Sequence, residues 1–198
     1  MSISLFAGAH EDAADEYDRD NKKQAAVLFK KACVNGEVWG LGCNALATQY
    51  LRGEGVDQDI PRAVKLFTKS CAENVQQSCI VLGRLYYNGQ IDIKQDKMKA
   101  LELFEKACEA RYQEACVYAG YMYMQGDAVR QDKMRAKKLF TQACEGNQAE
   151  ACNKLGLIHV QHMAEQEKLM AKEFFGTACN NGSIEGCKNY KILNEEGY

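Results

Sequence analysis

Ten cysteines are the side chains of this chain with the clearest capacity for chemistry, because paired thiols either form disulfides or bind a metal ion. They fall into five pairs: Cys33 and Cys43, Cys71 and Cys79, Cys108 and Cys116, Cys144 and Cys152, and Cys179 and Cys187. Four pairs are eight residues apart and the first is ten apart, while successive first members are 38, 37, 36 and 35 residues apart. Zinc sites built from cysteine pairs use C-x-x-C spacing, which the sequence lacks. The pattern predicts one disulfide within each repeat. Reduced, buried thiols in a cytosolic protein are the alternative.

The other reactive side chains match no catalytic motif. The serines are Ser2, Ser4, Ser70, Ser78 and Ser183. None is followed three positions later by the lysine of a serine β-lactamase. His10-Glu11 begins like a metalloprotease helix, but position 14 is alanine. We therefore predict no catalytic residue, no metal ion and no cofactor.

Two local motifs have a simple structural interpretation. His159 and His162 have the i, i+3 spacing that can hold a metal, but no carboxylate or cysteine is placed to complete a site. We favour His159 as a packed aromatic substitute and His162 as an extension of the helix. The glycosylation pattern Asn181-Gly182-Ser183 is explained as well by a glycine turn between two helices.

The elements that position the cysteines are indicated by further repeated residues. Alanine stands eight residues and phenylalanine four residues before the first cysteine of every pair: Ala25/Phe29, Ala63/Phe67, Ala100/Phe104, Ala136/Phe140 and Ala171/Phe175. This spacing predicts a buried stripe on a helix, here named helix A. Tyrosine and glycine follow the second cysteine by seven and ten residues in three repeats: Tyr50/Gly53, Tyr86/Gly89 and Tyr123/Gly126. They predict a second helix, helix B, that ends at glycine.

Aspartates begin the next repeat. Asp59, Asp96 and Asp132 are suited to cap the following helix A, and Pro61 is suited to a first turn. The sequence thus predicts an all-α chain of helix hairpins. Because one hairpin cannot bury its own stripe, the hairpins must stack on one another.

This pattern resembles the Sel1-like repeat, a relative of the tetratricopeptide repeat, and is most similar to the Helicobacter cysteine-rich protein family. Residues 81–89 are a near-consensus helix B, and Leu155-Gly156 is a second match. The resemblance implies an α-solenoid, a right-handed superhelix of stacked antiparallel hairpins, each with a disulfide between helices A and B. It also raises penicillin binding with weak β-lactamase activity as an alternative function.

We predict a single domain over residues 1–198. Its repeats span about residues 21–58, 59–95, 96–131, 132–166 and 167–198. Residues 1–20 are predicted to form a half-repeat cap, because residues 13–17 match a helix B that lacks its helix A.

The arrangement of charge is the best sequence indication of binding. Basic residues stand nine or two positions before the first cysteine in several repeats: Lys31, Arg62, Lys69, Lys99, Lys106 and Arg135. Seven residues are two helical turns, so both positions share one face of helix A. These six residues, named the basic ladder, would line a concave surface in a protein that resembles this family. An ordinary solvated helix face is the alternative.

Composition limits the partners. A net charge of −2 favours neither nucleic acid nor a membrane surface, and no stretch is apolar enough for a membrane span. Disulfides favour a periplasmic or secreted protein, although residues 3–9 are too short for the apolar core of a signal peptide. We expect a monomeric, non-catalytic scaffold that binds a protein or peptide partner, in particular an acidic one.

Overall fold

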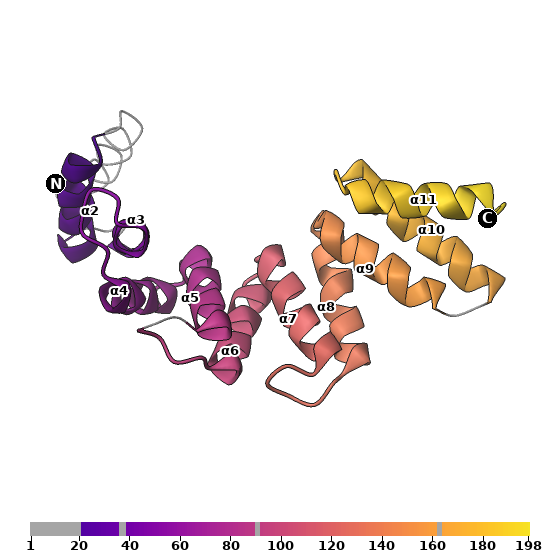
Figure 1. The fold of residues 1–198 in the computed structure, drawn as a ribbon, viewed down its shortest axis with the longest axis horizontal. Helices are drawn as coiled ribbons and strands as arrows, with labels where there is room; N and C mark the ends of the chain where they lie inside the picture. Colours follow the sequence, from indigo (N-terminus) through magenta and orange to yellow (C-terminus); the bar gives the residue numbers. More distant parts are fainter. Residues whose placement is uncertain (1–20, 36–38, 90–91, 162–163) are drawn as a thin grey trace. The chain divides into compact units, whose positions relative to one another are not determined.

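The computed structural model describes residues 21–35, 39–89, 92–161 and 164–198. Within these ranges it contains helices and no β-strand (Figure 1). The helices are α2 (Lys22–Asn35), α3 (Trp39–Arg52), α4 (Ile60–Ala72), α5 (Gln76–Asn88), α6 (Lys97–Glu109), α7 (Gln113–Gln125), α8 (Lys133–Glu145), α9 (Ala149–Val160), α10 (Glu165–Asn180) and α11 (Ile184–Glu195). Even-numbered helices are the predicted helices A and odd-numbered helices are the predicted helices B. The predicted all-α solenoid of helix hairpins is confirmed.

The chain divides into two compact units, Met1–Leu103 and Phe104–Tyr198, with the boundary inside α6. The predicted cap of residues 1–20 lies outside the described residues, and the single domain over residues 1–198 stays a prediction. No helix in the described ranges is long and apolar enough to cross a membrane.

The predicted caps are present at both ends of the hairpins. The carboxylates of Asp59, Asp96 and Asp132 accept hydrogen bonds from the backbone N–H three residues ahead, at 2.8, 3.0 and 2.9 Å. Each such cap stabilises its helix by about 1 kcal/mol. Helices B are followed by glycines in the left-handed region: Gly53, Gly89 and Gly126, with φ of 68°, 67° and 76°. These two signals set where helix A begins and where helix B ends.

The turn from helix A to helix B also follows one rule. The residue three positions after the first cysteine has a positive φ in four repeats: Asn74 (60°), Arg111 (62°), Asn147 (62°) and Gly182 (92°). Asparagine and glycine tolerate this conformation, whereas a long side chain such as that of Arg111 is strained in it. The turn therefore requires a positive φ at this position, which the residues of three repeats tolerate and Arg111 does not.

All five predicted disulfides are formed, with Cα–Cα distances of 4.4 to 4.8 Å. They join Cys33 to Cys43, Cys71 to Cys79, Cys108 to Cys116, Cys144 to Cys152, and Cys179 to Cys187. Each predicted pairing is therefore confirmed, and every bridge lies within one hairpin. The alternative of reduced, buried thiols is not what the structure contains.

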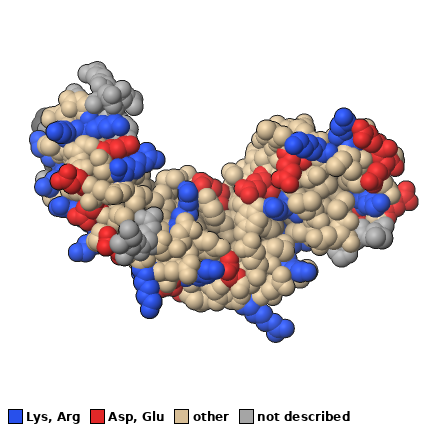
Figure 2. All heavy atoms as spheres, viewed as in Figure 1, with Lys and Arg blue, Asp and Glu red and all other residues tan. Residues whose placement is uncertain are grey.

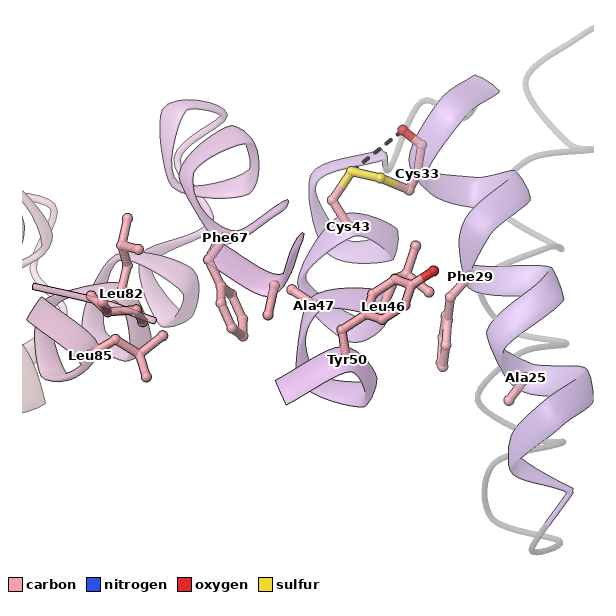
Figure 3. Close-up of a cluster of buried hydrophobic side chains, with 12 residues drawn as sticks. Ala25, Phe29, Cys33, Cys43, Leu46, Ala47, Tyr50, Phe67, Leu82 and Leu85 are labelled. Atoms are coloured by element: carbon pink, nitrogen blue, oxygen red, sulfur yellow. Dashed lines mark hydrogen bonds between the residues drawn. A yellow bond between two sulfur atoms is a disulfide. The ribbon is translucent and has the colours of Figure 1, made fainter. Parts of the chain in front are cut away.

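The disulfides hold helices A and B at close range. Figure 3 shows the first bridge joining α2 to α3. The two helices approach so closely that a Cβ at Gly42 would lie 2.7 Å from the Ala32 Cβ. In the last hairpin, a Cβ at Gly186 would lie 2.6 Å from the Ala178 Cβ. Small residues are needed beside the disulfides because the packed helices leave no room for larger ones.

The predicted Ala/Phe stripe is the core. Its alanines are fully buried, and its phenylalanines are at most 5% exposed. In Figure 3 the ring of Phe29 lies close to Leu46 and Tyr50, and Phe67 points from α4 toward Ala47 on α3. In the second unit, Gly120 and Gly156 of helices B lie against the rings of Phe140 and Phe175. The glycine at this position of helix B thus makes room for the phenylalanine of the next helix A.

Candidate functional site

Half of the basic ladder lies against tyrosine rings. Arg62 and Lys99 stand in the first turns of helices A, and their charged groups lie 4.8 and 4.2 Å from the ring centroids of Tyr50 and Tyr86. The Lys99 ammonium also donates a hydrogen bond to the Tyr86 hydroxyl at 2.9 Å. Each tyrosine stands near the end of the preceding helix B, so these cation–π contacts connect one repeat to the next. A contact of this kind at an exposed site is worth about 0.5–1 kcal/mol.

In the second unit, the cation–π contact between Arg135 and Tyr123 also involves a carboxylate, that of Glu105. The Arg135 guanidinium lies 4.5 Å from the Tyr123 ring centroid and 2.6 Å from the Glu105 carboxylate. The Tyr123 hydroxyl donates to the same carboxylate at 2.7 Å. Burial, together with this hydrogen bond, raises the pKa of Tyr123 to about 12. Arg135 therefore has a structural role whatever else it does.

The other three ladder residues are exposed on the surface of helix A: Lys31, Lys69 and Lys106. Lys69 and Lys106 stand in the last turns of α4 and α6, where a positive charge interacts favourably with the helix dipole. Figure 2 shows Lys and Arg interspersed with Asp and Glu on the face in view. The ladder thus contains two kinds of position, one in contact with tyrosines and one near the ends of helices A.

His159 is a packed aromatic side chain, as the favoured interpretation expected. It is 2% exposed, its ring lies 5.3 Å from that of Phe174, and its Nδ1 is 2.6 Å from a Glu167 carboxylate oxygen. His162 lies outside the described residues. No group of three metal-ligating side chains occurs in the described part of the chain.

The described serines have structural partners. Ser70 and Ser78 are fully buried between the first and second repeats, with their oxygens 2.7 Å apart. The Ser70 hydroxyl donates to the Gly40 carbonyl at 2.6 Å. Ser183 accepts a hydrogen bond from the Gly186 N–H as the N-cap of α11. The buried pair was not predicted. Its signal in the sequence is that Ser70 and Ser78 replace the small residues that precede each cysteine elsewhere.

The structure also contains grooves on the helix B side, which sequence reasoning missed. In the first unit a groove of about 350 Å³ lies between α3 and α5. In the second unit a groove of about 280 Å³ lies between α9 and α11. The residues that line them were assigned no role from the sequence, because their types differ from repeat to repeat.

The hairpins, their disulfides and their shared helix frame define a helical repeat protein of the α-solenoid class. The Sel1 repeat model matches residues 40–75, 76–112, 113–148 and 149–183. The chain therefore belongs to the Sel1 repeat family. Each matched segment begins at a helix B and extends past the next helix A. The family model therefore uses the same repeat as the sequence analysis, with its start shifted by half a repeat.

Solved structures agree with this assignment. A protective antigen of uropathogenic Escherichia coli that displays this repeat fold superposes with a TM-score of 0.85 at 24% identity. The match covers 98% of this chain but only 42% of that one. A Sel1 repeat protein from Oxalobacter formigenes has a TM-score of 0.77 at 20% identity, over 95% of this chain and 84% of that one.

The resemblance to the cysteine-rich proteins is confirmed as well. Helicobacter pylori cysteine-rich protein B matches with a TM-score of 0.51 at 26% identity, over 66% of this chain and 94% of that one. A search of curated protein sequences found no match. Sel1 repeats are in general protein-interaction modules, and the five disulfides indicate a non-cytoplasmic protein.

Proposed function

We propose that this chain is a non-catalytic scaffold of the periplasm or the cell exterior that binds a protein or peptide partner on its helix A face. The observation that carries the proposal is the recurrence of exposed cations at equivalent positions of helix A in successive repeats. Stacked repeats present equivalent residues side by side, and such arrays use extended surfaces for binding. Positive charge at regular intervals suits an extended acidic partner, and this attraction weakens with salt.

The contacts of the ladder determine how the proposal is tested. Replacing Arg135 would remove its ion pair with Glu105 as well as any contact with a partner. The informative variant therefore reverses the three ladder residues in the C-terminal halves of helices A: Lys31, Lys69 and Lys106. Its matched control reverses three exposed lysines that lie outside helices A: Lys94, Lys188 and Lys191.

The experiment is partner capture from the periplasm and culture medium, followed by affinity measurement with the purified partner. The ladder variant should lose at least tenfold in affinity at low salt and less at high salt, while the control keeps its affinity. Equal affinities of wild type and ladder variant at both salt concentrations would contradict binding on helix A. Thermal unfolding of all three proteins checks that the fold is retained.

Penicillin binding with weak β-lactamase activity is the alternative, and it comes from the family resemblance alone. Acyl transfer from a β-lactam needs an accessible nucleophile beside a base. Ser70 and Ser78 are fully buried, and Ser183 is a helix cap. Nitrocefin hydrolysis by protein free of contaminating enzyme would favour the alternative, and hydrolysis that persists in the Ser183→Ala variant would direct attention to other residues.

A further inference from the structure

The groove of the first unit combines an apolar base with a polar rim. It is lined by residues of α3, α4 and α5: Asn44, Thr48, Leu51, Arg52, Phe67, Gln77, Val81, Arg84, Leu85 and Asn88. Leu51 and Val81 are half-buried and form its accessible base, and the buried Phe67 and Leu85 complete the apolar lining. Arg52 and Arg84, one from each helix B, are exposed at the rim. The groove is large enough to take one side chain of a ligand together with its backbone.

In the second unit, tyrosines cover the corresponding core phenylalanines. The Tyr121 ring lies edge-on to Phe140 at 5.4 Å, and its hydroxyl donates to Glu150 at 2.7 Å. Tyr118 stacks on Phe104 at 4.9 Å. Tyr121 stands five residues and Tyr118 two residues after Cys116, the second cysteine of their repeat.

The groove of the first unit lacks both covers. The residue five positions after Cys43 on α3 is Thr48, and the residue two positions after Cys79 on α5 is Val81. Both are smaller than tyrosine and leave the groove open, although Phe67 itself is fully buried. A tyrosine at either position would occupy the groove.

Charge distinguishes this groove from the one between α9 and α11. In the groove between α9 and α11, the Lys168 ammonium is 3.9 Å from the Glu196 carboxylate and donates to the Tyr198 hydroxyl at 2.8 Å. Among the residues that the structure describes, no carboxylate lies within ion-pair distance of Arg52 or Arg84. Two such guanidinium groups at the rim of an apolar groove are complementary to a ligand that carries carboxylates.

We propose that the groove between α3 and α5 binds a peptide segment in which an apolar side chain is flanked by carboxylates. The apolar side chain lies on Leu51 and Val81, where its burial supplies affinity. The carboxylates pair with Arg52 and Arg84, which set the register of the peptide. Asn88 also lines the groove, and its side-chain amide can hydrogen-bond to the peptide backbone. This inference rests on the proposed function as a peptide-binding scaffold, and it adds a helix B pocket to the helix A surface.

The test uses fluorescence anisotropy with labelled, terminally blocked peptides of three cores: Glu-Phe-Glu, Gln-Phe-Gln and Glu-Ala-Glu. The first should bind saturably and the other two at least tenfold more weakly. Arg52→Glu and Arg84→Glu should each weaken Glu-Phe-Glu binding at least tenfold, whereas Arg130→Glu, at an exposed position outside the groove, should leave it unchanged. Thr48→Tyr, which copies the cover provided by Tyr121, should abolish binding without changing charge.

Thermal unfolding confirms that each variant is folded, and Val81→Tyr replaces Thr48→Tyr if the latter is unstable. Binding that survives both the tyrosine cover and Arg84→Glu overturns the proposal, as does the absence of saturable binding. Self-association that is lost in Thr48→Tyr also overturns it, because a second copy then occupies the groove. If the wild-type chain does not bind the peptide and Thr48→Tyr leaves partner capture unaffected, the groove proposal is overturned and the proposed scaffold function stands. If the chain binds the peptide but captures no partner, the groove proposal stands and the proposed scaffold function is overturned.

Discussion

Gly120→Ala is expected to destabilise the second unit, although alanine is the better residue in a helix. The new Cβ would lie 2.7 Å from the Phe140 Cε1, 3.0 Å from its Cδ1 and 3.1 Å from its Cζ. Phe140 is fully buried and its ring makes a T-shaped contact with the ring of Tyr121, so the Phe140 ring has no free space to move into. Overpacking of this kind costs about 1–3 kcal/mol. The higher helix propensity of alanine returns about 0.5–1 kcal/mol, so the net loss is about 1–2 kcal/mol.

The physical cause can be isolated with a double-mutant cycle. Phe140→Ala alone should cost about 3–5 kcal/mol, as expected for a deleted core aromatic. In that background the ring is gone, and Gly120→Ala should become stabilising by about 0.5–1 kcal/mol. The coupling energy between the two sites is then about 1.5–3 kcal/mol, within the range for residues in contact.

Urea unfolding followed by far-ultraviolet circular dichroism, with the disulfides intact, measures all four corners of the cycle. Gly176→Ala is the matched control, because its Cβ would meet only the Tyr190 ring at 3.3 Å, and that ring is 38% exposed. The control should be neutral or stabilising by up to about 1 kcal/mol. Additive effects of Gly120→Ala and Phe140→Ala would refute the reasoning, since the ring would then not be the obstacle.

Three further predictions follow from the turns, the Tyr123 contact and the disulfides. Arg111→Asn should raise the free energy of unfolding by about 1 kcal/mol, since asparagine tolerates a φ of 62°; an unchanged or lower urea midpoint would contradict this. Because the pKa of Tyr123 is raised from 10.0 to about 12 in the folded chain, stability should fall as pH rises through that interval. Glu105→Gln should lower this pKa, read from tyrosinate absorbance. Replacing Cys144 and Cys152 together by alanine should cost about 2–3 kcal/mol in the loop-entropy account, and an unaltered thermal midpoint would show that this disulfide does not stabilise the fold.

The features that the sequence predicted correctly are those encoded by neighbours on one or two helices. The cysteine pairs, the aspartate caps such as Asp59 and the stripe that contains Phe67 follow from spacings of three, four and eight residues. Such spacings place the residues on one face of a helix, and their recurrence in five repeats strengthens that interpretation. The pairing of Cys179 with Cys187, for example, follows from the same frame as the four pairs before it.

The partners of the ladder were missed, although the sequence contains a signal for them. Arg62 and Lys99 follow their tyrosines by 12 and 13 residues. In the fourth repeat the tyrosine gives way to His159, and Met170 stands where the cation would be. Because the tyrosine and the cation are absent together, the sequence indicates that these two positions are in contact. The open groove between α3 and α5 had no such signal, because it depends on which positions lack an aromatic side chain.

The disulfides determine what a protease can do to this chain. Each bridge encloses the turn between helices A and B of one hairpin, and none joins one hairpin to another. A cut between Cys71 and Cys79 therefore leaves both fragments covalently attached, whereas a cut in the loop before Asp96 separates the chain. Cleavage in a turn thus keeps the two fragments joined by a disulfide, and cleavage in a loop does not. Loop cleavage is thus the route by which a protease would divide the chain into separate hairpins.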